Sequence, residues 1–121
     1  MRSKPFSVKE VIECEEFTKL IKKNTDKDLI TNSCKTAIKS FKFSNNPPQI
    51  CLLYEDCVYQ VWKFRIPNPN CNRGLSAGFR LYAYFNKENL VFYLYKIFQK
   101  NDIDKIPDID GKIKKEIKKI Y

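Results

Sequence analysis

The sequence contains no histidine, and this absence excludes several catalytic arrangements. A Ser-His-Asp triad, a Cys-His dyad and a ribonuclease mechanism with two histidines all need an imidazole to move the proton. A zinc site would then depend on closely spaced cysteines, and none of the five cysteines forms a Cys-x-x-Cys pair. We therefore expect no metal site and no other cofactor.

Long apolar runs are also missing. No stretch approaches the length that spans a membrane, and the first residues lack the apolar segment of a signal peptide. An odd number of cysteines, five in all, does not suggest a disulfide framework. We expect a protein of the reduced cytoplasm with no membrane partner.

What the sequence does contain is positive charge and enough apolar residues for a core. Its 121 residues, 43% of them hydrophobic and 14% aromatic, predict one folded domain over residues 1–121. The net charge of +9 indicates a polyanion or an acidic protein as partner. Most lysines could simply be solvated on the surface, but the clustering of cations between Lys63 and Lys100 indicates a functional site.

Hydrophobic periodicity predicts the elements of an α+β fold. We expect the two early helices to form a hairpin that packs on one face of an antiparallel-rich sheet, in the order β-α-α-β-β-β-α. Cys34 falls on the apolar stripe of the second helix and should lie in the core. The predicted ranges are a strand at 6–11, helices at 13–23 and 27–41, strands at 57–66, 78–85 and 90–98, and a helix at 111–121.

Alternation along two of these strands places cations and tyrosines on the same face. Lys63 and Arg65 share one face of their strand, and Arg80, Tyr82 and Tyr84 share one face of the next. Pairing the strands should create a concave cationic surface beside tyrosine rings. Guanidinium groups bind phosphates through paired hydrogen bonds, and aromatic rings stack on unpaired bases. The face is thus predicted to bind RNA, with a solvated, non-functional face as the alternative.

The segment from Ile66 to Arg80 is rich in proline, asparagine and glycine and is too long for a tight hairpin turn. With the Lys63-x-Arg65 pair before it and Lys100 after the last strand, it resembles the RelE/ParE superfamily of bacterial toxin–antitoxin systems. The resemblance is to the RelE-like subgroup, through the pattern N-P-x-x-N-R-G-x-S-x-G-[FY]-R that runs from Asn68 to Arg80.

The resemblance implies a toxin that enters the ribosomal A site and cleaves mRNA there, and that a cognate antitoxin protein holds inactive. It implies a RelE-like fold over the single domain. The catalytic set is then expected to be Lys63, Arg65, Arg80 and Lys100, and the RNA-binding set Arg73, Tyr82, Tyr84 and Lys96.

The chemistry can also be argued from the residues. The RNA's own 2′-hydroxyl can attack the adjacent phosphorus, so the protein needs only to orient the chain, assist proton transfer and stabilise charge. Arginines suit charge stabilisation, and a lysine crowded by other cations, Lys63 or Lys100, could serve as base. Two alternatives share the fold: a DNA gyrase inhibitor of the ParE type, and a decayed toxin that binds its antitoxin without cleaving RNA.

The antitoxin is expected to act on the same face. A free protein of this charge with an open cationic sheet face would be harmful, so the antitoxin should cover that face or displace the terminal helix. Gly111 would provide the hinge just before that helix.

Overall fold

The computed structural model describes residues 8–22, 26–40, 50–67 and 78–121. Within these ranges, five strands form one sheet and four helices pack around it. The elements are β1 Glu10–Glu13, α1 Glu15–Ile21, α2 Lys27–Lys39, β2 Ile50–Glu55, β3 Tyr59–Ile66, β4 Phe79–Asn86, β5 Val91–Gln99, α3 Lys100–Ile103 and α4 Ile109–Lys118.

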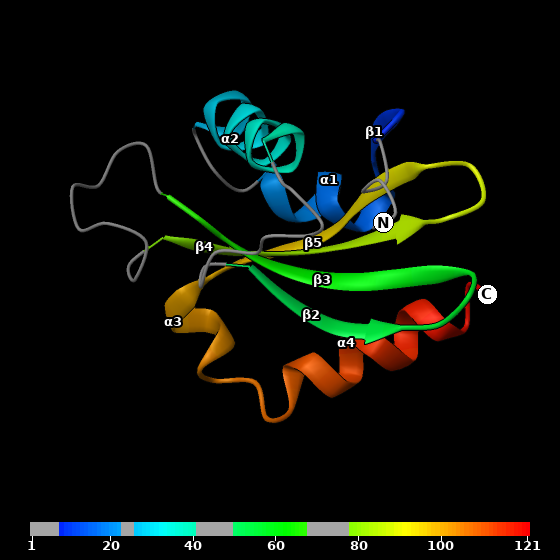
Figure 1. Cartoon of the computed structure of the whole chain (residues 1–121). Coiled ribbons are helices and arrows are strands. Elements are labelled where there is room, and N and C mark those ends of the chain that lie inside the picture. Colours follow the sequence, from blue (N-terminus) through cyan, green and yellow to red (C-terminus); the bar gives the residue numbers. More distant parts are fainter. Residues whose placement is uncertain (1–7, 23–25, 41–49, 68–77) are drawn as a thin grey trace.

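The strands lie in the order β1-β5-β4-β3-β2, with α1 and α2 on one face of the sheet and α4 on the other (Figure 1). β1 runs parallel to β5, and every other neighbouring pair is antiparallel. The structure mixes helices with an antiparallel-rich sheet, which is consistent with the predicted α+β class.

The predicted order of elements was incomplete, because it lacked β2 and α3. The sequence of β2, Ile-Cys-Leu-Leu-Tyr-Glu, does not alternate between apolar and polar residues. A bulge between Leu52 and Tyr54 explains this, since it leaves Leu53 without a partner in β3 and disrupts the alternation. Lys100 follows the last strand and is the first residue of the short helix α3.

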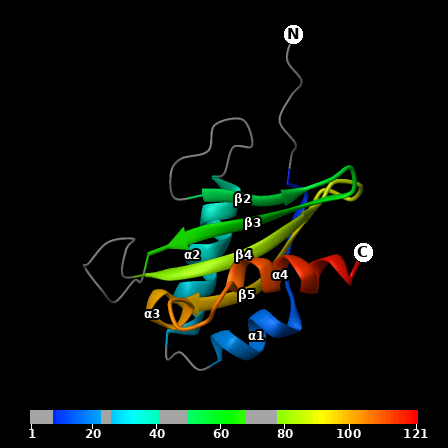
Figure 2. The same ribbon diagram turned by 90° about the horizontal axis from the view of Figure 1, so that it is seen from below.

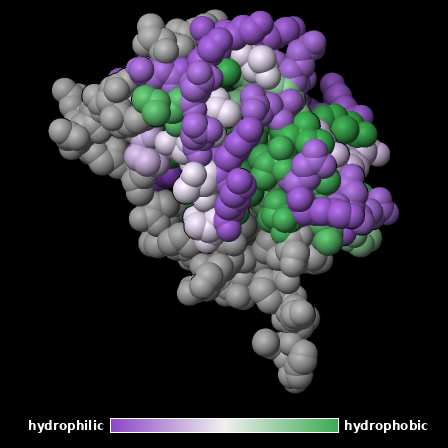
Figure 3. Space-filling view, turned by 90° about the horizontal axis from the view of Figure 1, so that it is seen from above, coloured by the Kyte–Doolittle hydropathy of each residue, from purple (hydrophilic) through white to green (hydrophobic). Residues whose placement is uncertain are grey.

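The first core lies between the sheet and the helical pair. The predicted apolar stripe of α2 is confirmed, since Ile30, Cys34 and Ile38 are all buried. Figure 3, which views this side of the molecule, shows mainly hydrophilic side chains along the outer surface of α2 and a hydrophobic area beside them. The buried members of this core are Phe17, Ile21, Ile30, Cys34, Ile38, Trp62, Phe64, Ile66, Phe79, Leu81, Ala83, Phe85, Phe92, Leu94 and Ile97.

A second core occupies the opposite face, which we had expected to be open. α4 lies against this face (Figures 1 and 2), and the side chains of Ile113 and Ile117 are 1% and 0% exposed. A helix of 10 residues is too short to be stable alone, so burying this stripe against the sheet is what holds it. The sheet contributes the buried residues Tyr59, Val61, Tyr82, Tyr84 and Tyr95.

The start of α4 also differs from the prediction. The helix begins at Ile109, so Gly111 lies within it rather than forming a hinge before it. Asp108, which precedes the helix, adopts a left-handed conformation with φ 50°, and its carboxylate folds back over Gly111. A β-carbon at position 111 would overlap that carboxylate. The glycine therefore permits this close approach, and a larger residue would require the Asp108 carboxylate to move.

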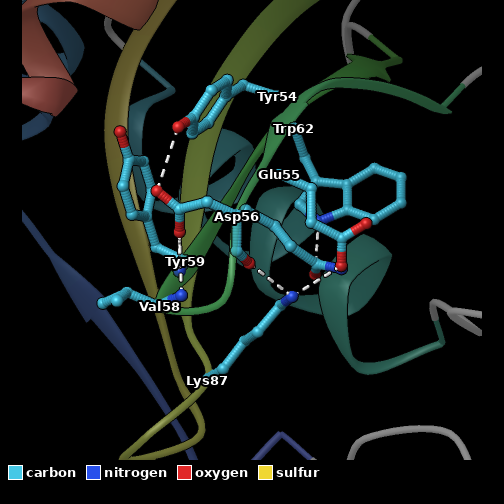
Figure 4. Close-up of polar contacts among 8 residues, drawn as sticks. Tyr54, Glu55, Asp56, Val58, Tyr59, Trp62 and Lys87 are labelled. Atoms are coloured by element: carbon cyan, nitrogen blue, oxygen red, sulfur yellow. Dashed lines mark hydrogen bonds and ion pairs between the residues drawn. The ribbon is translucent and has the colours of Figure 1, made fainter.

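The turns at one end of the sheet are joined by a polar network (Figure 4). The Asp56 Oδ1 atom accepts hydrogen bonds from the backbone N–H groups of Val58 and Tyr59, at 2.8 and 3.0 Å. Lys87, from the turn between β4 and β5, places its Nζ atom 2.7 Å from Glu55 Oε2 and 2.6 Å from the Asp56 carbonyl oxygen. The network thus connects the β2–β3 turn, and Tyr59 at the start of β3, to the turn between β4 and β5.

The two isoleucines at the end of the chain allow a matched test of the docking of α4. Ile117→Ala should lower the free energy of unfolding by about 2–5 kcal/mol, because it leaves a cavity in the second core. Ile120→Ala should change it by no more than about 0.5 kcal/mol, because Ile120 is 54% exposed. Urea unfolding followed by circular dichroism measures both. Equal losses in the two variants would contradict the packing described above.

Candidate nucleic-acid interface

Two arginines face each other across neighbouring strands at the end of the sheet where β3 stops and β4 starts. Arg65 of β3 and Arg80 of β4 are direct partners in the strand register. Arg65 is exposed, whereas Arg80 is 6% exposed and donates from Nη1 to the Phe79 carbonyl oxygen at 3.3 Å. Burial, followed by the positive charge of Arg65, lowers the pKa of Arg80. The sheet thus holds two like charges together at a partly buried position.

Lys100 lies beside this pair. Its backbone N–H donates to the Gly78 carbonyl oxygen at 3.1 Å, which ties the start of α3 to the start of β4. Its Nζ atom lies 3.2 Å from Asp104 Oδ2. Asp104 in turn acts on Arg80, whose pKa it raises against the larger lowering effects of burial and Arg65. Arg65, Arg80 and Lys100 therefore gather at one end of the sheet, as predicted.

Lys63 joins the same face one row further along β3, but it is already paired. Its Nζ atom lies 3.2 Å from Asp110 Oδ1, at the start of α4. Tyr82, the partner of Lys63 on β4, donates its hydroxyl hydrogen to the same carboxylate oxygen. Burial and this hydrogen bond raise the pKa of Tyr82. Asp110 thus occupies the position where a phosphate would meet Lys63.

Lys96 is paired in the same manner. A bulge in β5 places Lys96 opposite Tyr82 and leaves Tyr95 without a partner in β4, so that both side chains reach α4. Glu116 Oε1 accepts from Tyr95 Oη at 2.8 Å and from Lys96 Nζ at 2.9 Å. The two acids of α4 therefore neutralise the two lysines of this row of the sheet.

The tyrosines predicted to stack on RNA are covered. Tyr82 is 0% exposed and Tyr84 is 6% exposed. The Tyr84 ring stacks on Tyr93, with centroids 4.8 Å apart, and meets Tyr121 edge-on at 5.8 Å. With α4 docked, neither ring offers a face to a base, because the helix buries its isoleucine stripe on them. The open tyrosine face was therefore a wrong expectation, while the strand register does bring Lys63, Arg65 and Arg80 onto one face, as alternation predicted.

Sequence reasoning missed the acids that neutralise this face. Asp110 and Glu116 both flank the stripe of Ile113 and Ile117, and this spacing could have placed them on the inner side of the helix. The lysines of the segment are more numerous than its acids and indicated only a cationic helix. The remaining predicted RNA-binding residue, Arg73, lies outside the described residues.

Comparisons with protein-family models, curated proteins and solved structures found no match to this chain. In the described part of the chain, no group of three or more histidine, cysteine or acidic side chains is arranged to hold a metal ion. Among the helices described, none combines the length and apolarity needed to cross a membrane.

The contact between Glu116 and the sheet predicts a pH dependence of stability. Burial alone would raise the pKa of Glu116, but the hydrogen bonds from Lys96 and Tyr95 outweigh it and leave the pKa below its ordinary value of 4.5. A carboxyl group with a lowered pKa in the folded state stabilises the fold above its unfolded-state pKa and loses that effect as the pH falls. Glu116→Gln should therefore be less stable than the wild type at neutral pH.

The difference should narrow as the pH falls below about 4, where the wild-type carboxyl becomes protonated. Urea unfolding at several pH values measures it. Glu88→Gln is the matched control, since Glu88 is exposed in the turn between β4 and β5. Removing its charge should change the free energy of unfolding less. A gap between wild type and Glu116→Gln that stays constant with pH would contradict the ion pair.

Proposed function

We propose that this chain is the toxin of a toxin–antitoxin pair, of the RelE type, and that it cleaves mRNA on the ribosome. The observation that carries the proposal is the direct pairing of Arg65 with Arg80 across two strands. Like charges placed opposite each other in a sheet destabilise it, and a bound anion would remove that cost. A phosphate bound between the two guanidinium groups would turn this repulsion into paired hydrogen bonds.

The proposed reaction uses the RNA's own 2′-hydroxyl as nucleophile. Its oxygen attacks the adjacent phosphorus and forms a cyclic phosphate, while the bond from phosphorus to the 5′-oxygen breaks. Water takes the proton of the 2′-hydroxyl, and the leaving 5′-oxygen gains one. Arg65 and Arg80 stabilise the charge that builds up on the phosphate oxygens.

Lys63 and Lys100 fit a role as phosphate-neutralising cations better than the base role expected from the sequence. Each holds a carboxylate 3.2 Å from its Nζ atom, Asp110 for Lys63 and Asp104 for Lys100. To act as a base, either lysine would first have to leave its carboxylate. To neutralise a phosphate, it needs only to exchange one anion for another.

The proposed partners follow from the same charges. The toxin would bind the ribosome and mRNA in its active state and a cognate antitoxin in its inactive state, and its place of action would be the cytoplasm. A net charge of +9 supports both anionic partners. An acidic segment of the antitoxin would compete with RNA for Arg65, the exposed member of the arginine pair.

Substitution of the arginine pair tests the proposal. Arg65→Ala and Arg80→Gln should each reduce cleavage of ribosome-bound mRNA by about 10²–10³-fold, as expected for the loss of one charge-stabilising donor. Arg65→Lys should restore little of the activity, because an ammonium cannot replace the planar fork of donors. Primer extension on mRNA from translating ribosomes locates the cut sites and measures how much mRNA is cleaved at each.

Lys39→Gln is the control, since it removes one exposed positive charge at the end of α2, on the other side of the sheet. It should cleave at the wild-type rate. Intact mRNA together with a supercoiling defect would favour the gyrase inhibitor instead. Full activity in folded Arg65→Ala and Arg80→Gln variants would remove the arginine pair from the reaction.

A further inference from the structure

A second surface suited to nucleic acid lies on the other side of α4, between that helix and the edge strand β2. It is a groove with a volume of about 270 Å³, and no residue of the predicted site lines it. Its lining consists of two tyrosines from the sheet and four residues from one side of the helix. These are Tyr54, Tyr59, Gly111, Lys114, Lys115 and Lys118.

The bulge in β2 shapes the sheet side of this groove. Tyr54 pairs with Val61, whose side chain is buried in the second core under α4, so Tyr54 lies on the α4 side of the sheet. Its ring is tilted against Tyr59, with centroids 5.3 Å apart, and the residue is still 36% exposed. Its hydroxyl group donates to Asp56 Oδ2 at 3.0 Å, which fixes the ring in place (Figure 4). The groove thus presents an oriented, accessible aromatic surface.

Tyr59 forms the deeper part of the floor and is held from both sides. Besides Tyr54, it stacks on Tyr121 with centroids 4.3 Å apart and planes 8° from parallel. Gly111 contributes no side chain, so the wall of α4 leaves room beside the rings. A planar group that enters the groove would meet rings already in position, which lowers the entropy cost of binding.

The helix side of the groove carries three lysines, while the sheet side has one carboxylate, Asp56, at the Tyr54 hydroxyl. Lys114, Lys115 and Lys118 form no ion pair with any residue the structure describes. The acids of the same helix, Asp110 and Glu116, are turned toward Lys63 and Lys96 of the sheet. The docking of α4 therefore separates its charges, with carboxylates inside and ammonium groups along the groove.

We propose that this groove binds single-stranded nucleic acid, with a base stacked on Tyr54 and the adjoining phosphates at Lys114, Lys115 and Lys118. Base stacking on an aromatic ring combined with a cationic track is how proteins bind single strands without reading their sequence. The inference does not depend on the proposed function, because neither Arg65 nor Arg80 takes part. A stack and a phosphate contact do not use the 2′-hydroxyl, so DNA should bind here as well as RNA.

The test measures fluorescence anisotropy of a labelled single-stranded oligothymidylate with the full-length protein. This probe lacks the 2′-hydroxyl and cannot be cleaved by the proposed reaction, so binding is measured apart from catalysis. Tyr54→Ala should weaken binding by about tenfold, through loss of one stacked base. Tyr54→Phe keeps the ring but loses the hydrogen bond to Asp56, so it should weaken binding much less than Tyr54→Ala.

Paired lysine variants separate the groove from general attraction to a positive protein. Lys114→Gln with Lys118→Gln should weaken binding and reduce the slope of log affinity against log salt by about 1.4, for two lost phosphate contacts. Lys22→Gln with Lys39→Gln removes the same charge from exposed positions at the ends of α1 and α2 and should weaken binding much less.

Three results would overturn the proposal. The first is no binding of the oligonucleotide by the folded wild type. The second is equal weakening by the two lysine pairs, which would show attraction without a site. The third is unaltered binding of the oligonucleotide by Tyr54→Ala and by the Lys114/Lys118 variant, while both variants lose affinity for polyglutamate. That result would identify the groove as a site for an acidic protein segment.

Discussion

The docking of α4 on the sheet decides what the cationic face of this protein can do. Two carboxylates bring the helix to the sheet, Asp110 at Lys63 and Glu116 at Lys96. Ile113 and Ile117 then bury against tyrosines that would otherwise form an open aromatic surface. Because buried apolar area holds a helix this short in place, packing and charge neutralisation depend on each other.

The docked helix separates three groups of cations on its side of the sheet. Lys63 and Lys96 are neutralised beneath it. Arg65 and Arg80 lie past its first turn, at the end of the sheet where β4 starts, and their mutual repulsion supports the proposed phosphate site. The lysines on its outer side face the groove beside Tyr54, away from the arginine pair. A single strand of nucleic acid could contact both the arginine pair and the groove only by passing along α4. The two sites are therefore tested separately.

Alternation along the strands was enough to predict which residues share a face and the cationic row, but not that a second core covers the cationic face. Trp62 and Phe64 fall in the first core and Tyr59 and Val61 in the second, as a period of two requires. The bulges were beyond such reasoning, because an extra residue such as Leu53 or Tyr95 disrupts the period locally. The pairing of Asp110 with Lys63 joins residues 47 positions apart in the sequence. Such a contact depends on how α4 crosses the sheet, which its own sequence does not specify.

Under the proposed function, the acids of α4 occupy the lysines that would otherwise bind RNA phosphates on the sheet. The most direct measurement compares the affinity for single-stranded RNA of the wild type and of Asp110→Asn combined with Glu116→Gln. We expect tighter binding by the double variant and a steeper salt dependence, because two more lysines become available to phosphates. Asp28→Asn with Glu88→Gln removes the same charge from exposed positions and should have a smaller effect. Equal affinities and salt slopes for the wild type and the α4 variant would contradict the claim.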